Sequence, residues 1–507
     1  MARLGFCQKK GVANMRLGGM ILLGAFGLTG AASVLPAFAQ SGAVVVKEYA
    51  DGSVYEGMFR EGRQDGTGTY RLPNGYEYTG DWVAGEIRGM GVARYPNGSV
   101  YEGQFAAGKP EGRGKITFAD GGTYEGDWSG GAMTGTGRAS YANGTVYQGG
   151  FEAGVHQGEG ILEDDSGYRY EGSWVAGQKE GTGRIIYPDG AVYQGALVAG
   201  QRQGKGTLTM PDGLTFVGDW AAGQINGAGR LTQPNGDVYD GDFVDGQRQG
   251  QGRVTYGSGD IYQGGFARDK RDGQGRFVAV DGATYEGAWV AGLRAGPGVM
   301  SYADGSVYAG AFVGDKPEGQ GTISYPDGSG YDGQWEAGGI TGKGRSTYAG
   351  GLVYEGDFVK AEPQGTGVMT YPDGYRYEGA FKAGQRDGNG TATYPDGTVY
   401  EGDFVAGIRQ GKGRLTGPDG FRYDGDWRDG EIEGTGVATY PSGDFYEGQF
   451  VKGKRDGQGR LTYKGGQISE GVWKSGMLTA PLPQTADPAA APAAVVAPDP
   501  AVAPAVP

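Results

Sequence analysis

The chain has 507 residues, of which 109 are glycine, one is cysteine and one is histidine. So much glycine is typical of disordered or collagen-like chains, but 33 tyrosines, 18 phenylalanines and 8 tryptophans argue against disorder, and the glycines do not fall at every third position. The single Cys7 excludes a disulfide scaffold and a thiolate metal cage, and the single His156 argues against zinc sites and Ser-His-Asp catalysis. We therefore expect no catalytic residues, no metal site, no cofactor and no enzymatic activity.

The charge balance is acidic, with 45 Lys and Arg against 59 Asp and Glu, a net charge of -14. A chain of this charge gains nothing from counterion release on nucleic acid, so we expect no nucleic-acid partner. An anionic bilayer would also repel it on average.

The N-terminal residues 1–39 have the pattern of a signal peptide. Four basic residues and no acid accompany an apolar run from Leu17 to Leu35, and Ala37-Phe38-Ala39 fits a cleavage site before Gln40. The alternative is an uncleaved anchor helix. We expect export by general secretion to the periplasm or the outside of the cell, with association with the cell envelope as a further option.

The rest of the chain is dominated by one repeat. The motif Tyr-x-Gly occurs at Tyr55, Tyr78 and Tyr101 and recurs every 23 residues through Tyr446, with Phe216 as the only substitute for tyrosine. Eighteen repeats thus occupy residues 55–468. An N-terminal half repeat (40–54) precedes them, a degenerate capping repeat (469–480) follows, and residues 481–507 form a Pro/Ala-rich tail that we expect to be disordered.

Each repeat has the pattern of two short strands. With the first tyrosine as position 0, glycine occupies +2, +7, +11, +13 and +20, and only Asp269, Asp315 and Ala361 break this rule, all at +7. Apolar residues spaced by two predict strands over 0 to +4 and +13 to +17, with the turn within the repeat between the glycines at +7 and +11. Pro-Asp-Gly or Pro-Asn-Gly at +18 to +20, as in Pro188-Asp189-Gly190, predicts the turn to the next repeat.

The pattern Tyr-Glu-Gly-x-Phe/Trp-x-x-Gly-x-x-x-Gly-x-Gly resembles the MORN repeat, over about residues 49–476. The resemblance implies an all-β fold, an elongated, twisted, single-layer antiparallel sheet of stacked β-hairpins. It also implies a non-enzymatic role in scaffolding, dimerisation or membrane-associated assembly, for which phospholipid binding has been proposed. Some members of the family carry a phosphatidylinositol-phosphate kinase domain, for which this chain has no residues left.

The aromatic residues at positions 0 and +4 should share one face of the sheet. A single layer leaves this face uncovered, and a large apolar surface usually marks an interaction site, unless curvature buries the rings against one another. The predicted face includes Tyr55, Phe59, Tyr78, Trp82, Tyr101, Phe105, Tyr124, Trp128, Tyr170, Trp174, Tyr285, Trp289, Tyr423 and Trp427.

Carboxylates at position +1 recur along the chain, but about 10 Å between repeats is too far for a shared calcium ion. If the strands pair 0, +2 and +4 with +17, +15 and +13, then position +3 faces +14. Cross-strand ion pairs are then expected between Asp219 and Arg230, Asp242 and Arg253, and Asp403 and Arg414.

Position +9 is basic in many repeats and is expected in the turn within the repeat, at one edge of the sheet. This row is the best candidate contact for an anionic lipid or an acidic polymer, but the explanation that we favour is that charged turns only maintain the solubility of a long sheet. His156 is expected to be an incidental turn residue. The row consists of Lys179, Arg202, Arg248, Arg271, Arg294, Arg386, Arg409 and Arg455.

From these features we expect a scaffold or protein-interaction protein of the cell envelope, with protein partners or a second copy of itself. The alternative function is ligand binding, in which phospholipid or envelope glycan contacts the aromatic face or the basic row.

Overall fold

The computed structural model describes residues 43–481, which contain strands and no helix. They form 39 strands of one open antiparallel sheet, as expected for stacked hairpins. No helix in the described range is long and apolar enough to cross a membrane. The predicted signal peptide, and the predicted tail beyond Pro481, lie outside the described residues.

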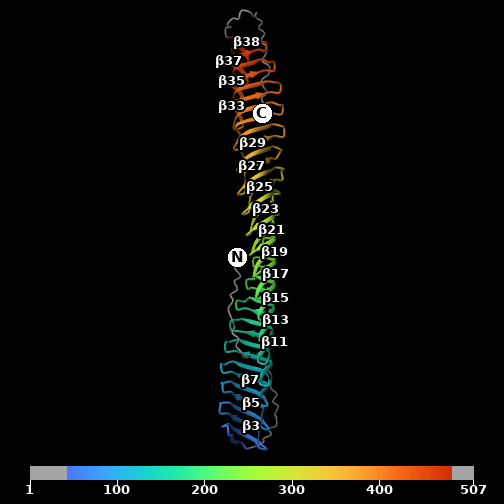
Figure 1. The fold of residues 1–507 in the computed structure, drawn as a ribbon, viewed down its shortest axis with the longest axis vertical. Helices are drawn as coiled ribbons and strands as arrows, with labels where there is room; N and C mark the ends of the chain where they lie inside the picture. Colours follow the sequence, from blue (N-terminus) through green and yellow to red (C-terminus); the bar gives the residue numbers. More distant parts are fainter. Residues whose placement is uncertain (1–42, 482–507) are drawn as a thin grey trace, which may run out of the picture. The chain divides into compact units, whose positions relative to one another are not determined.

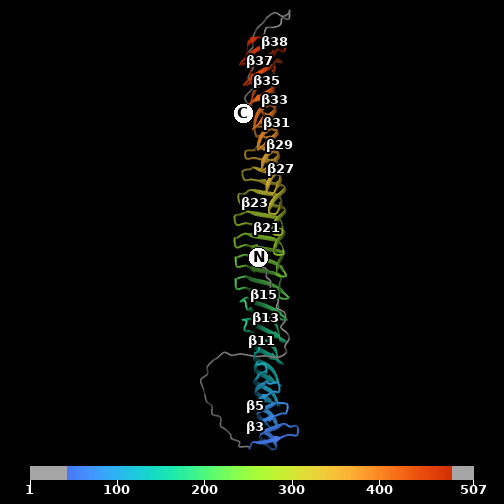
Figure 2. The ribbon, with the colours of Figure 1, turned by 90° about the vertical axis from the view of Figure 1, so that its left-hand side faces the viewer.

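The contacts divide the chain into two compact parts. The N-terminal part runs to Gly259 and includes Gly265–Asp269, and the C-terminal part comprises Asp260–Gly264 and the chain from Lys270. Within each part the strands follow one another in chain order (Figures 1 and 2), so each repeat contacts the repeats before and after it.

Every repeat contributes two strands of constant length. The first strand covers positions -1 to +5, from β2 (Val54–Arg60) to β38 (Ile468–Lys474), and the second covers +8 to +16, from β3 (Arg63–Arg71) to β37 (Lys454–Thr462). The sheet begins with the short β1 (Val45–Glu48) and ends with β39 (Met477–Pro481). Both strands of the repeat are therefore longer than the sequence pattern predicts.

The turn within the repeat does not lie between the glycines at +7 and +11, as predicted, but at +6 and +7. In the hairpin of β16 (Thr215–Ala221) and β17 (Gln224–Thr232) these residues are Ala222 and Gly223, with φ of 48° and 82°. Two successive positive φ angles define the tight turn that matches the twist of paired strands. The prediction was wrong because Ala-Gly, unlike Asn-Gly, is a weak turn signal.

The glycine at +11 forms part of a β-bulge. In the same hairpin Gly218 pairs with Gly229 and Trp220 with Ile225, so Asp219 faces three residues of the second strand. Gly227, at +11 within this bulge, has a φ of 108°. The bulge and the two-residue turn together place position 0 opposite +15 instead of +17.

This register removes the ion pairs predicted between +3 and +14 of one repeat. Position +14 instead faces +1 of the next repeat, as Arg230 faces Asp240. Position +3 faces +12 of the preceding repeat, as Asp219 faces Lys205. The pairs that form are Arg230 with Asp240 at 2.6 Å, Arg414 with Asp424 at 2.7 Å, and Lys205 with Asp219 at 2.7 Å. They lie on the face opposite the aromatic residues and are exposed, so they stabilise the sheet little.

The turn between repeats is confirmed in its position and in its mechanism. Asp189 accepts a hydrogen bond from the Ala191 N–H at 3.0 Å through Oδ1, and Gly190 has a φ of 86°. The Tyr187 N–H donates to the Ala191 carbonyl at 2.8 Å, and the Gly190 N–H to the Tyr187 carbonyl at 2.9 Å. This turn is closed by its own residues.

The core of the sheet consists of tyrosine rings that lie flat on glycine backbone. In the hairpin of β14 (Val192–Val198) and β15 (Gln201–Thr209), Gly195 pairs with Gly206 under the ring of Tyr193. A Cβ atom on Gly195 would lie 2.6 Å from the Tyr193 hydroxyl oxygen, and one on Gly206 would lie 2.6 Å from Cε2 of the ring. The Tyr193 hydroxyl donates to the Ala196 carbonyl at 2.8 Å, so the buried phenol is satisfied.

Candidate interaction surfaces

The aromatic face predicted as an uncovered surface is the core of the fold. Of the fourteen predicted residues, all but Phe59 are at most 7% exposed, and the position-0 tyrosines among them are 0% or 1% exposed. Phe59, in the first repeat, is half-buried. The expectation of an apolar face open to partners is therefore wrong, and the option of mutual burial is the one observed.

The rings bury one another in an edge-to-face ladder. Tyr101 contacts Phe105 of its own repeat and Trp128 of the next, with both centroid distances at 5.0 Å. Trp128 also donates a hydrogen bond to the Gly114 carbonyl at 3.2 Å. Because most position-0 tyrosines touch a +4 ring on both sides, with Leu197 the exception at +4, one layer of strands acquires a continuous core.

The basic row at +9 does not lie in a turn. Position +9 is the second residue of the second strand, pairs with the aromatic residue at +4, and points into the aromatic face. Arg248 is 9% exposed and Arg455 is 5% exposed. The predicted placement of this row in an exposed turn is therefore wrong. Its predicted role in binding a lipid or polymer stays a prediction, and no exposed row of bases supports it.

Each +9 base connects two repeats. The Arg202 guanidinium lies 4.2 Å from the centroid of the Trp220 ring and donates to the Gly223 carbonyl, at the turn of the next repeat, at 2.7 Å. Burial lowers the pKa of Arg202, and it lowers the pKa of Lys179 to about 8. The same contacts to the next repeat recur at Arg271, Arg386, Arg409 and Arg455.

Two exceptions to glycine at +7 are explained by this row. Asp269 and Asp315 have φ of 68° and 72° and follow repeats with arginine at +9. Arg248 contacts Asp269 at 3.3 Å, and Arg294 contacts Asp315 at 3.1 Å. The ion pair offsets part of the conformational cost of a non-glycine residue at a positive φ.

His156 occupies position +9 in β11 (Val155–Glu163), so its prediction as a turn residue is wrong. Its ring stacks on Tyr147 with 3.6 Å between centroids, and Nε2 lies 2.8 Å from the Tyr141 hydroxyl. Burial lowers the pKa of His156 to about 4. The sequence held a signal for the buried character of +9, because Met133, Ile225 and Ile432 occupy the same position and are also buried.

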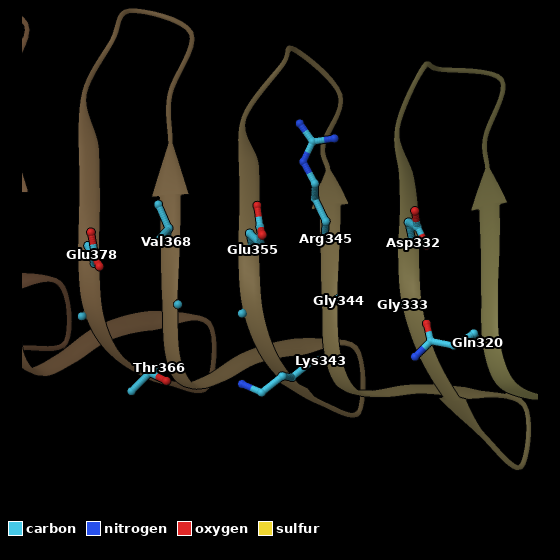
Figure 3. Close-up of a pocket in the computed structure, with 13 residues that line it drawn as sticks. Gln320, Asp332, Gly333, Lys343, Gly344, Arg345, Glu355, Thr366, Val368 and Glu378 are labelled. Atoms are coloured by element: carbon cyan, nitrogen blue, oxygen red, sulfur yellow. The ribbon is translucent and has the colours of Figure 1, made fainter.

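Positions +1, +12 and +14 of the repeat are mostly exposed. On the face opposite the aromatic core, positions +1, +12 and +14 line an open hollow of about 780 Å³ in the C-terminal part. Figure 3 shows Asp332, Arg345 and Glu355 side by side on neighbouring strands of this hollow. Beside them Lys343 bonds to Asp357 at 2.9 Å, which lowers the pKa of that carboxyl.

A second exposed row lies at +5, next to the turn within the repeat. Val359, Val405 and Val451 are 52%, 55% and 45% exposed. Between them, in alternate repeats, Lys382 and Arg428 occupy the same position. Within the described residues, no group of three or more His, Cys, Asp or Glu side chains could hold a metal ion.

Comparison with known proteins agrees with this repeat architecture. The family model described as the MORN repeat matches eighteen consecutive segments between residues 55 and 468. Alsin from Mus musculus and alsin from Homo sapiens are each 44% identical over 52 residues, which are 9% of this chain and 3% of alsin. The chain thus matches only a small segment of these curated relatives.

Solved structures resemble the chain only weakly. The SAS-4 (dCPAP) TCP domain of Drosophila melanogaster, in complex with a proline-rich motif of Ana2, has 16% identity and a TM-score of 0.20, covering 42% of this chain and 99% of that chain. A streptogramin B lyase structure has 9% identity and a TM-score of 0.10, covering 68% of this chain and 92% of that chain. Neither likeness carries a functional argument. The eighteen matched segments cover most of the chain, which therefore belongs to the MORN-repeat family.

Proposed function

We propose that this protein is a non-enzymatic scaffold that presents a repetitive surface to protein partners. MORN repeats generally form scaffolds of this kind. The observation that carries the proposal is that the positions that pack the core of each repeat are separate from the positions that are exposed. Tyrosine at 0, the aromatic residue at +4 and the glycines at +2 and +13 serve internal packing, whereas +1, +5, +12 and +14 are mostly exposed and vary from repeat to repeat.

This division suits recognition of extended partners. Neighbouring strands are about 4.8 Å apart, so equivalent side chains of successive repeats follow at about 10 Å. A partner that runs along the strand-to-strand direction would meet the same position again and again and could gain affinity from repeated weak contacts. The mixed charges at +1, +12 and +14 would set its register more than its affinity.

The cellular setting in this proposal is the cell envelope, which the protein would reach by general secretion. The support is the basic and apolar sequence of residues 1–39 with its small-residue site before Gln40. Fractionation of the producing cells, with determination of the N-terminal residue of the mature chain, tests this point. A chain that starts at Gln40 outside the cytoplasm is the expected result, and a cytoplasmic chain that retains Met1 would contradict it.

Phospholipid or glycan binding through the aromatic face or the +9 row does not belong to the proposed function. It depended on the aromatic face and on the +9 basic row, and these side chains are engaged in the core. Self-association remains a second form of protein partnership within the proposal.

The scaffold proposal is tested by photo-crosslinking in the producing cells. A photoreactive amino acid is placed at exposed positions of the C-terminal part, Arg345 and Glu355 in the hollow and Val405 at +5, and at the buried Phe404 as a control. We expect discrete protein adducts from at least one exposed position and none from Phe404. A complete lack of adducts from every exposed position would overturn the proposal.

A further inference from the structure

The turns between repeats form an edge that carries tyrosine at +17 and carboxylates at +19. In three consecutive repeats of the C-terminal part this edge contains Tyr302, Tyr325 and Tyr348, with Asp304 and Asp327 on the turns beside them. We call these five residues the tyrosine edge. Tyr302 and Tyr348 are half-buried, and Tyr325 is 40% exposed.

Elsewhere in the chain, the aromatic residues of this edge hold a base from the chain itself. Lys179 lies 4.5 Å from the centroid of the ring of Tyr168, which is at +21 and not at +17, bonds to its hydroxyl, and interacts with Asp164 at +17. Arg455 lies 5.8 Å from the centroid of the Tyr440 ring. In these repeats an aromatic ring near a turn therefore already contacts a cation, the side chain at position +9.

In the tyrosine edge this internal base is missing. The +9 residues that correspond to Tyr302, Tyr325 and Tyr348 are Pro317, Ile340 and Pro363. Among the described residues, no ring stacks on these three tyrosines and no side-chain cation lies over them, whereas Tyr371 and Tyr394 pack on Tyr375 at 5.2 and 5.1 Å. These three tyrosines therefore lack the internal cation that lies beside the equivalent Tyr440, and Tyr325 is the most exposed of them.

The carboxylates of the edge are ionised and lack a counter-charge. Oδ1 of Asp304 accepts from the Ser306 N–H at 2.8 Å, and Oδ1 of Asp327 accepts from the Ser329 N–H at 2.9 Å. Hydrogen bonds from the serine hydroxyl and backbone lower the pKa of both carboxyls. Neither carboxylate forms an ion pair with another described residue, whereas Asp315 and Asp357 do. Both carboxylates act on Tyr325, which places the negative charge beside its ring.

We infer that the tyrosine edge is the docking surface for a lysine- or arginine-rich segment of a partner protein, whose cations lie over the tyrosine rings beside the two carboxylates. This inference rests on the proposed function and specifies the chemistry of one partner. The support is charge complementarity and the position of the chain's own Arg455 beside the ring of Tyr440, the equivalent tyrosine at +17. Anionic lipid is disfavoured here because the edge is itself negative.

The spacing of the rings specifies the segment further. Successive tyrosines should be about 10 Å apart, the distance of two strands. A polyproline II helix has three residues per turn and rises about 9 Å per turn, so a base at every third residue presents all its cations on one side at nearly this spacing. The partner segment is therefore expected to carry Lys or Arg at every third position.

The test uses the full chain and a labelled peptide of about four Lys-Pro-Pro triplets. Two control peptides replace lysine with glutamate or collect the same lysines in one block. Binding is measured by fluorescence anisotropy at about 50 mM and about 300 mM NaCl, because a charge-dependent contact weakens with salt. We expect the triplet peptide to bind more tightly than both controls, and to bind more weakly at the higher salt concentration.

Two variants locate the binding. Asp304→Asn with Asp327→Asn removes both charges, and asparagine occupies the same turn position natively at Asn74 and Asn97, so the fold is retained; we expect about fivefold weaker binding. Ile340→Arg supplies the missing internal base and should compete for Tyr325, again with about fivefold weaker binding. Asp189→Asn with Asp212→Asn, at turns of the N-terminal part, is the matched control and should bind as the native chain does.

The inference is overturned if the triplet peptide does not bind, if the control peptides bind equally well, or if the two variants behave as the matched control does. None of these results would affect the scaffold proposal, which is decided by adducts from the hollow and the +5 row. Loss of those adducts with retained peptide binding would instead overturn the broader proposal and leave the tyrosine edge as a separate site.

Discussion

The two turns of each repeat reach similar tightness by opposite means. The turn between repeats, such as Pro188-Asp189-Gly190, is closed by its own aspartate, glycine and backbone. The turn within the repeat, such as Ala222-Gly223, is supported by the preceding repeat. Gln203 accepts from the Ala222 N–H at 2.9 Å, and Arg202 donates to the Gly223 carbonyl. One turn is local chemistry, and the other is an interface between repeats.

The largest effect should follow removal of the support from the preceding repeat. Arg202→Ala deletes the contact with Trp220 and leaves the Gly223 carbonyl without its side-chain donor, at a cost of about 3 kcal/mol in the opening of the β16–β17 hairpin. Arg202→Met, with a residue that the chain uses at Met133, should cost about 1 kcal/mol. Hydrogen exchange of the hairpin amides measures both, and equal protection in the two variants would contradict a cross-repeat role.

His156 allows the same kind of support to be titrated. Its pKa is lowered to about 4 in the folded chain and returns to about 6.5 on unfolding, so the unfolded chain binds the proton more readily. Stability is therefore retained above pH 6.5 and falls as the pH drops from 6.5 towards 4, by about 2 kcal/mol at pH 5.

His156→Gln isolates this contribution, because Gln64 occupies the same position natively and bonds to the Tyr49 hydroxyl at 2.9 Å. Denaturant titrations of both chains should show that the free energy of unfolding of the native chain falls increasingly below that of the variant as the pH is lowered from 7.5 to 5. Parallel pH profiles would show that His156 titrates normally.

The turn between repeats should respond only to its own residues. Asp189→Ala removes the bond to the Ala191 N–H and should cost about 1 kcal/mol, whereas Asp189→Asn should be nearly neutral. Protection of the amides in the next turn within a repeat, Ala199-Gly200, should stay unchanged in both variants. A loss of protection there would remove the distinction between the two kinds of turn.

The smallest effect is a gain. Ala222 has a φ of 48°, where alanine is disfavoured, and Ala222→Asn gives the turn the Asn-Gly sequence that such turns prefer. We expect stabilisation by about 0.5 kcal/mol, seen as a raised denaturation midpoint. In the Arg202→Ala background the gain should be at least as large, because the turn then keeps only the Gln203 hydrogen bond from the preceding repeat. A lower midpoint would contradict the assignment of this turn.

The same contrast explains what could be predicted from the sequence. The strand class, the repeat length and the Pro-Asp-Gly turns followed from local patterns, and the structure confirms them. The register did not, because the bulge at Gly227 and the Ala222-Gly223 turn depend on contacts with neighbouring strands. The basic row was misplaced for a related reason. Charge suggested solvent, whereas Trp220 and the Gly223 carbonyl give Arg202 a buried place.

The predicted interaction surfaces were wrong for the same physical reason. Aromatic residues in one layer suggested an open face, but flat packing of each tyrosine over two glycines and two edge-to-face neighbours buries the rings. The tyrosine edge was not predicted, because it depends on the absence of a base at Pro317, Ile340 and Pro363. The absence of a base at these positions is informative only because the structure shows that +9 side chains point towards the tyrosines at +17.

The central claim is that the position-0 tyrosines form an internal core, whereas Tyr325 of the tyrosine edge is exposed. Hydroxyl-radical footprinting of the intact chain, with mass spectrometry of the tyrosine-containing peptides, tests it directly. We predict protection of Tyr193, Tyr354 and Tyr423, which are 0% exposed, and rapid modification of Tyr325, with Tyr302 and Tyr348 between these limits. Modification of the position-0 tyrosines at the rate of Tyr325 would contradict the account.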